Sequence, residues 1–235
     1  MKKFFSAILL TFILAGCAAA PPLKPEVSDN LRSSTIAAAF YMVNKSISYN
    51  EMVYKVLWNE TRSQTSTFEG IWDVDKDLCR VMTEEMMNQH LNTIPIDEVL
   101  TDEAIYNDFA DAMRAPVWVD SKRAPLKLGA NVVRKLKQSG IGYVVAVRSV
   151  HFYLSTTSMN SFGPMAVPSD LRVYDVNNGE EVYGVNYPMG GRIDWGKSVR
   201  NIESNNLATL KEASRKWVRL STEKELPKRL GLVAH

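Results

Sequence analysis

The run Ile141-Gly-Tyr-Val-Val-Ala-Val-Arg-Ser-Val-His-Phe-Tyr-Leu154 is the strongest strand signal in the chain. Its first half is apolar at consecutive positions, which is typical of a strand whose two faces are both covered. We therefore expect a central strand of a sheet with other layers packed on it. The segments on either side supply its neighbours and the helices that cover them.

A β-hairpin follows this run. Leu171–Val176 and Glu181–Tyr187 are alternating segments separated by Asn177-Asn178-Gly179. Asn-Gly between two such segments predicts a tight turn, because both residues tolerate a positive φ. The intervening segment Thr156–Ser169, rich in Ser, Gly and Pro, is predicted to be a loop.

Amphipathic patterns predict four helices. The first begins at Asp73, and its apolar residues recur at spacings of three and four up to about Leu91. The others are Asp102–Met113 with Thr101 as its N-cap, Leu128–Ser139 ended by Gly140, and Asn206–Leu220.

The segments that precede the first helix are less regular. Thr35–Val43 is apolar, and its periodicity does not choose between strand and helix. Glu51–Trp58 alternates and favours a strand, with a helix as the alternative. Asn59–Gly70 is predicted to be a loop, and Thr93–Ile96 a short strand. Together these elements predict a single-domain α+β fold: a mixed, mostly antiparallel sheet with helices packed on one face.

The N-terminus carries an export signal. Lys2 and Lys3 precede the apolar run Phe4–Leu14, which is too short to span ~30 Å of hydrocarbon. Leu14-Ala15-Gly16-Cys17 matches a lipobox, which predicts cleavage after residue 16 and lipid on Cys17; an ordinary signal peptide cut near Ala18–Ala20 is the alternative. Because Ala18 and not Asp follows the cysteine, we expect a lipid anchor on the periplasmic face of the outer membrane.

These features predict a domain plan. Residues 1–16 are the signal peptide, 17–34 the lipidated cysteine with a flexible tether, 35–220 the periplasmic domain and 221–235 a C-terminal tail. Removing the signal takes away two of the 28 lysines and arginines, so the mature chain balances its 26 acidic residues. This balance gives no reason to expect nucleic acid as a partner.

Three patterns resemble chemical sites. Asp73, Asp75, Asp77 and Glu84 have the spacing of a calcium-binding loop, but Leu78 stands where that loop needs glycine. We therefore interpret the acidic residues as the N-terminal charges of a helix. The other two patterns are Cys79 with His90 or His151 as nucleophile and base, and Met82, Met86, Met87 and His90 as copper ligands.

Burial explains the last two patterns better, because Cys79 and the methionines lie on an apolar helical stripe. The sequence contains no motif typical of serine hydrolases, zinc peptidases or phosphate-binding loops. We predict no catalytic residue, no metal and no cofactor. Trp72, Trp118 and Trp195 occupy turn-like settings and are candidate partner contacts, with core packing as the alternative.

Two stretches carry a family resemblance: Gly140-Ile-Gly-Tyr-Val-Val-Ala-Val147, and Leu171-Arg-Val-Tyr-Asp-Val-Asn-Asn-Gly-Glu-Glu-Val182. Over residues 50–220 the chain resembles the small α/β domain of the TolB amino-terminal region, the curli-secretion lipoprotein and lipoproteins that activate penicillin-binding proteins. The resemblance implies a TolB-N/anticodon-binding-like fold and an adaptor that acts through protein contacts. The longer Ser155–Ser169 loop and the lack of a pore-forming insertion depart from the pattern.

We therefore expect a non-enzymatic outer-membrane lipoprotein that acts as a scaffold or adaptor in a transport, appendage or wall-synthesis complex. Its expected partners are the membrane, through the lipid, and envelope proteins, with a homo-oligomer as one form of assembly. The alternative is a periplasmic small-molecule-binding, glycan-binding or hydrolytic lipoprotein. Its cleft would lie near the 155–169 loop and the turn Met189–Trp195.

Overall fold

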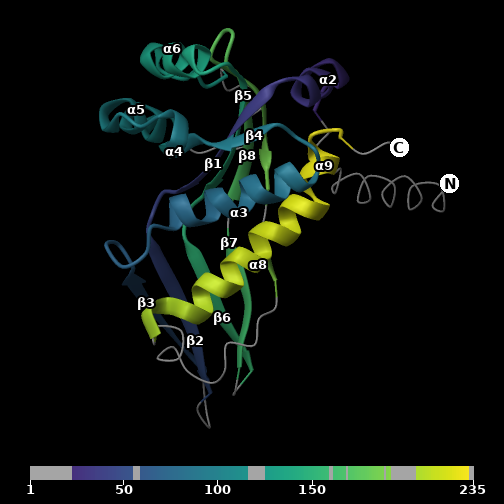
Figure 1. Ribbon diagram of the computed structural model, residues 1–235. Helices are drawn as coiled ribbons and strands as arrows, with labels where there is room; N and C mark the ends of the chain where they lie inside the picture. Colours follow the sequence, from purple (N-terminus) through teal and green to yellow (C-terminus); the bar gives the residue numbers. More distant parts are fainter. Residues whose placement is uncertain are drawn as a thin grey trace, which may run out of the picture.

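The computed structural model describes residues 23–54, 59–115, 125–158, 161–167, 169–187, 189–191 and 205–232. These residues form an α+β fold with two mixed sheets and packed helices, which confirms the expected fold class (Figure 1). The strands are β1 (Thr35–Met42), β2 (Ser46–Tyr54), β3 (Asn59–Thr67), β4 (Thr93–Pro95), β5 (Ile141–Ser149), β6 (Phe152–Ser158), β7 (Ser161–Val167), β8 (Ser169–Asp175), β9 (Glu180–Asn186) and β10 (Met189–Gly191). The helices are α2 (Pro25–Ser33), α3 (Val74–Asn88), α4 (Ile96–Val99), α5 (Glu103–Arg114), α6 (Ala130–Gln138), α8 (Ala208–Lys224) and α9 (Leu226–Arg229), with a 3₁₀ turn at Asn205–Leu207.

The upper sheet of Figure 1 has the order β4-β1-β5-β8-β9. Strand β5 lies at its centre, as its apolar sequence predicts. It pairs in parallel with β1 and antiparallel with β8, and β8 and β9 form the predicted hairpin. Successive residues along β1, β5 and β8 are buried, so both faces of the sheet are covered at its centre.

The lower sheet has the order β10-β7-β6-β2-β3. Strand β2 pairs in parallel with β6 and antiparallel with β3. The strand predicted over Glu51–Trp58 is confirmed up to Tyr54, begins earlier at Ser46, and has residues 55–58 outside the described part. Two predicted loops are strands instead: Asn59–Thr67 forms β3 and Ser161–Val167 forms β7.

The two sheets meet at a bend that interrupts neighbouring strands at the same level. The run predicted as one strand from Ile141 to Leu154 breaks at Val150 and His151 and continues as β6. Residues 43–45 likewise separate β1 from β2. The backbone N–H of Val43 donates to Ser149 O at 2.9 Å, and that of Asn44 to Val150 O at 2.9 Å. These bonds align the two interruptions side by side.

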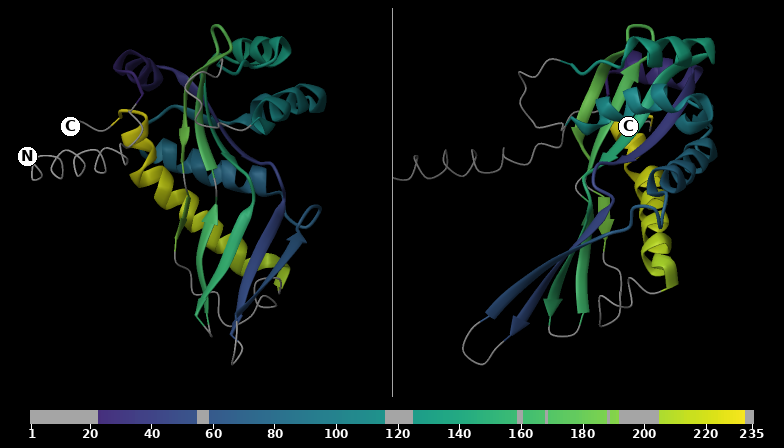
Figure 2. Two further views of the ribbon diagram at one scale, coloured as in Figure 1. Left: turned by 180° about the vertical axis from the view of Figure 1, so that it is seen from behind. Right: turned by 90° about the vertical axis from the view of Figure 1, so that its left-hand side faces the viewer.

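Helices α3 and α8 lie side by side against one face of the strands (Figures 1 and 2). The apolar stripe predicted for α3 is buried, and Asp73 caps the helix by accepting from the Lys76 N–H at 3.3 Å. Helix α5 is capped by Asp102 and not by Thr101, because the Asp102 carboxylate accepts from the N–H groups of Ala104 and Ile105.

Below the bend, helix covers one side of the lower sheet. The right-hand view of Figure 2 shows α8 and α3 on that side of the strands. Ile47, Tyr49, Phe152 and Leu154 are buried. The alternating residues Ser46, Ser48, Thr65 and Thr67 are half-buried or exposed, which places a hydroxyl-lined face on the opposite side of the sheet.

Both ends of the described chain belong to the folded body. Residues 23–34 were expected in the tether, but Pro25 starts helix α2 at the position that tolerates proline, and Leu23 and Leu31 are buried. Residues 221–235 were expected as a tail, but α8 continues to Lys224 and Leu226 and Leu230 are buried. No helix among the described residues is long and apolar enough to cross a membrane.

Candidate functional site

A polar cleft of about 720 Å³ lies at the bend, where α5 overhangs the hydroxyl-lined face of the lower sheet. Its floor includes Ser46, Ser48, Thr65 and Thr67. Its walls come from β1 and the bend, the first turn of α3 and one side of α5: Tyr41, Lys45, Asp75, Tyr106, Asn107, Arg114 and His151. The cleft therefore brings together residues from four segments that are distant in sequence.

An ion pair between the buried Asp75 and the half-buried Lys45 lies in the cleft. The Asp75 carboxylate accepts from the backbone N–H of Met42 at 2.8 Å and lies 3.3 Å from Lys45 Nζ. Burial raises the pKa of Asp75 above its ordinary value, while Lys45 and the Met42 N–H act in the opposite direction. The pair is neutral overall, and Asp75 fixes the end of β1 to the start of α3.

Most of the remaining polar groups of the wall are neutral or internally paired, and Glu69 adds one exposed carboxylate. Arg114 Nε donates to the Tyr41 hydroxyl at 3.3 Å and pairs with Asp111 through Nη1. Burial lowers the pKa of His151, so its ring is neutral at pH 7, and burial raises the pKa of the Tyr106 hydroxyl. Such a lining suits hydrogen bonds to uncharged polar groups, such as peptide amides or sugar hydroxyls, more than binding of a strongly charged ligand.

A buried arginine cluster holds the overhanging wall in place. Asp170 lies 3.2 Å from Arg148 Nη1 and 3.0 Å from Arg172 Nε. The two guanidinium groups also donate to the last carbonyl groups of α5, Ala112 O, Met113 O and Arg114 O, and to that of its C-cap residue, Ala115 O. Cations are favourable at a helix C-terminus, so the cluster fixes α5 over the cleft.

The electrostatics of this cluster follow from its burial. Desolvation lowers the pKa of Arg148, whereas Asp170 raises that of Arg172 despite the desolvation of its side chain. Sequence reasoning did not find the cluster. The sequence does contain a sign of it: Arg148 lies within an apolar strand, and Asp170 and Arg172 flank Leu171 in another. Charged side chains are rarely buried unless they are paired, so such positions indicate buried ion pairs.

The structure describes one of the four predicted site residues. Trp72 is 6% exposed, stacks on Phe152 with ring centroids 5.8 Å apart, and donates from Nε1 to Asp77 Oδ2 at 2.8 Å. Trp72 is therefore packed in the core and does not form an exposed contact surface. Cys17, Trp118 and Trp195 lie outside the described residues.

The acidic residues of the calcium-like pattern have separate partners. Asp73 caps α3, Asp75 pairs with Lys45, and Asp77 lies 3.0 Å from Arg215 Nη2. The segment is helical from Val74, so the interpretation as helix N-terminal acids is confirmed. Within the described ranges, no group of three or more His, Cys, Asp or Glu residues is placed to hold a metal ion.

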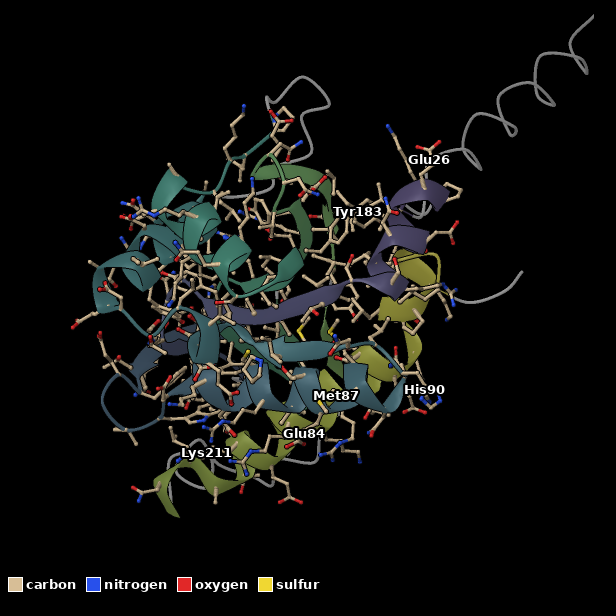
Figure 3. All side chains as sticks on the ribbon, turned by 45° about the horizontal axis from the view of Figure 1, so that its top comes forward. Glu26, Glu84, Met87, His90, Tyr183 and Lys211 are labelled. Carbon is tan, nitrogen blue, oxygen red and sulfur yellow. The ribbon has the colours of Figure 1, made fainter. Side chains whose placement is uncertain are left out.

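The other two patterns are also resolved by burial. Cys79 is 2% exposed and its thiol donates to Ala38 O at 3.1 Å. Burial raises the pKa of the thiol to about 11, so Cys79 is protonated and weakly nucleophilic at neutral pH. Met82 and Met86 are fully buried, while Met87 and His90 lie exposed near the end of α3 (Figure 3).

Residues 1–18 match the family model for the prokaryotic membrane lipoprotein lipid attachment site. The protein is therefore a lipid-anchored membrane lipoprotein, with Cys17 in the matched segment. A search of curated proteins gave no match.

Solved structures with related shapes share little sequence with this chain. The hypothetical protein CT253 from Chlamydia trachomatis is 8% identical, with coverage of 83% of this chain and 97% of that one and a TM-score of 0.46. The PelC dodecamer from Paraburkholderia phytofirmans is 10% identical (90% and 93% covered, TM-score 0.39). Lipoprotein GNA1162 from Neisseria meningitidis is 12% identical (80% and 99% covered, TM-score 0.33). These likenesses do not confirm the resemblance to the TolB, curli-secretion and penicillin-binding-protein-activator domains.

Proposed function

We propose that this lipoprotein is a non-enzymatic scaffold or adaptor of the outer membrane, which binds an envelope protein at the cleft and at the hydroxyl-lined face next to it. The observation that carries the proposal is the asymmetry of the lower sheet. One face of this sheet is covered by α3 and α8, while the other presents Ser46, Ser48, Thr65 and Thr67 below the overhanging α5.

The chemistry of this face supports a protein partner. Its hydroxyl groups and neutral His151 can pair with backbone and side-chain amides, and its charged pair Lys45–Asp75 is already satisfied. Strand β3 is also an edge strand of its sheet within the described residues. An edge strand next to a cleft suits recognition of an extended segment, in which backbone hydrogen bonds supply affinity and side-chain pockets supply specificity.

Two parts of the proposal rest on sequence. The outer-membrane location follows from Ala18, which stands where Asp would favour retention in the inner membrane. The non-enzymatic role follows from the absence of recognised catalytic motifs from the sequence, and the protonated, buried thiol of Cys79 agrees with it.

Site-specific photo-crosslinking in intact cells tests the proposal. A photoreactive residue at Thr65 lies in the cleft floor, and one at Glu84 lies on the exposed side of α3, so Glu84 is the matched control (Figure 3). We expect a discrete crosslinked envelope protein from Thr65 that Glu84 does not give. Identical products at both positions, or no product at Thr65, would contradict the proposal.

A second candidate function is binding of a small polar ligand, such as a glycan fragment, in the same cleft. Its volume falls within the range of about 300–1,000 Å³ that ligand pockets occupy. Thermal unfolding with a disaccharide-peptide fragment of the cell wall tests this candidate. The wild type should gain stability, whereas Ser48→Tyr, which fills the cleft from its floor, should not. Equal shifts for both proteins would exclude binding at this site.

A further inference from the structure

The folded body begins close to the lipid. Cys17 and Leu23 are six residues apart in the sequence, and Leu23 is 3% exposed. A fully extended chain of six residues spans at most about 20 Å. The start of the folded domain therefore lies within about 20 Å of the acyl chains, and a headgroup layer fills part of that distance.

The first folded segment is fixed to the last one. The Leu23 N–H donates to Arg229 O at 2.9 Å. On α2, Ser28 Oγ donates to Gly231 O at 3.0 Å and Arg32 Nη2 donates to Leu232 O at 2.6 Å. Because these bonds tie α2 to α9 and the residues after it, the anchor is attached at one defined place on a packed body.

Helix α3 separates this place from the cleft. Its first turn carries Asp75, which lines the cleft. At its other end, the Gln89 side chain donates to Thr222 O at 2.8 Å, near the start of α9. A helix of 15 residues is about 22 Å long, so the cleft and the anchored end lie on opposite sides of the domain. Figures 1 and 2 show the same arrangement, with α2 and α9 at one side and α5 at the other.

We propose that the end of the domain formed by α2 and α9 rests on the headgroup layer of the membrane that holds the lipid, so that the cleft faces away from that membrane. The short chain before Leu23 imposes this orientation. Charge contributes little, because the four basic residues Lys24, Arg32, Lys228 and Arg229 at this end are largely offset by the three acidic residues Glu26, Asp29 and Glu225. The proposal depends on lipid attachment and stands apart from the adaptor role.

Energy transfer in vesicles tests the orientation. The full-length, lipidated variants Glu26→Cys on α2 and Thr65→Cys on β3 carry a donor dye, in vesicles of phosphatidylethanolamine and phosphatidylglycerol with an acceptor on the headgroups. Cys79 is buried and stays unlabelled, as the wild type processed in parallel will verify. We expect transfer at position 26 at least twofold more efficient than at position 65, in both 50 mM and 500 mM salt.

A variant with a longer tether provides the second part of the experiment. Fifteen Gly and Ser residues inserted between Ala20 and Pro21 add an r.m.s. reach of about 20 Å, and the two efficiencies should converge. Equal efficiencies with the native tether would overturn the proposal. Two other results concern the difference in transfer efficiency between positions 26 and 65: that it persists with the long tether, or that it disappears in 500 mM salt with the native tether. Either result would show that affinity for the headgroups orients the domain, and would overturn the role of chain length. Failure of Thr65 to crosslink a protein partner would leave this result unaffected.

Discussion

Arg148 and Asp170 are directly opposed across β5 and β8, with Arg148 Nη1 3.2 Å from Asp170 Oδ2 and both side chains less than 10% exposed. Asp170 also binds Arg172, and the two arginines hold the carbonyl end of α5. One carboxylate therefore neutralises part of a doubly charged cluster that positions the wall of the cleft.

Asp170→Asn should be strongly destabilising. It leaves two buried guanidinium groups without an opposing charge, and breaking a buried pair from one side costs about 3–5 kcal/mol. Urea denaturation monitored by circular dichroism gives the free energy of unfolding. Lys228→Gln removes an exposed pair with Glu225 and should change it by less than about 1 kcal/mol. Similar losses for both variants would contradict the role given to Asp170.

Substitution of Asp75 should change how stability depends on pH. Its folded-state pKa is raised, so the stability that its side chain contributes is fully present below the unfolded pKa and declines as pH rises through the folded value. Asp75→Asn can still accept from the Met42 N–H. Relative to wild type, we expect it to become progressively more stable as the pH rises through the folded-state pKa of Asp75, as measured by urea denaturation over a series of pH values.

Asp75→Ala serves as the contrast to this prediction. It leaves the Met42 N–H without its acceptor and should destabilise the protein by about 1–3 kcal/mol. A free-energy difference between wild type and Asp75→Asn that does not vary with pH would show that Asp75 titrates normally.

His90→Gly should stabilise the protein. His90 follows α3 with φ +64°, and the Leu91 N–H donates to Met86 O at 3.1 Å, as in a helix ending that favours glycine. Glycine adopts this left-handed conformation without strain, so the substitution should raise the free energy of unfolding by about 1 kcal/mol. His90→Val should lower stability instead, because a β-branched residue resists this conformation. Thermal unfolding of the three proteins measures the order, and a less stable glycine variant would contradict it.

Trp72→Ala should lower the free energy of unfolding by about 3–5 kcal/mol, the usual loss when a buried aromatic side chain is truncated to alanine. Trp72→Phe keeps an aromatic ring against Phe152 and should cost clearly less. Because Trp72 is buried, Trp72→Phe should also leave crosslinking from Thr65 unchanged. Loss of the crosslink in a stably folded Trp72→Phe protein would show that this side chain reaches the partner.

Apolar patterning predicted the segments that pack in the core. The centre of the upper sheet and the buried face of α3 follow from it, while the Asn-Gly pair predicted the hairpin turn at Asn177–Gly179. The hydroxyl-rich strand β3 was predicted as a loop because an edge strand with one open face needs few apolar residues. Its Thr and Ser side chains are compatible with a strand whose backbone pairs with β2 along its length.

The bend and the cleft were not predictable in the same way. Alternation continues through Val150 and His151, so nothing in the local pattern marks the point where one sheet gives way to the next. The segment of helix α2 was predicted as tether because Pro21, Pro22 and Pro25 were interpreted as marks of flexible chain, although Pro25 stands at the first helical turn. The cleft depends on pairings between distant segments, such as Asp75 with Met42, which a single sequence does not reveal.

The bond between Ser28 and Gly231 joins residues 203 positions apart. Helix α2 emerges early during synthesis, yet its partners are among the last residues to be added. The region next to the lipid therefore completes its folding only after nearly the whole chain has been synthesised. A protein released early by a premature stop codon would carry its acyl groups on an unclosed end, which exposes Leu23 and Leu31 to proteolysis.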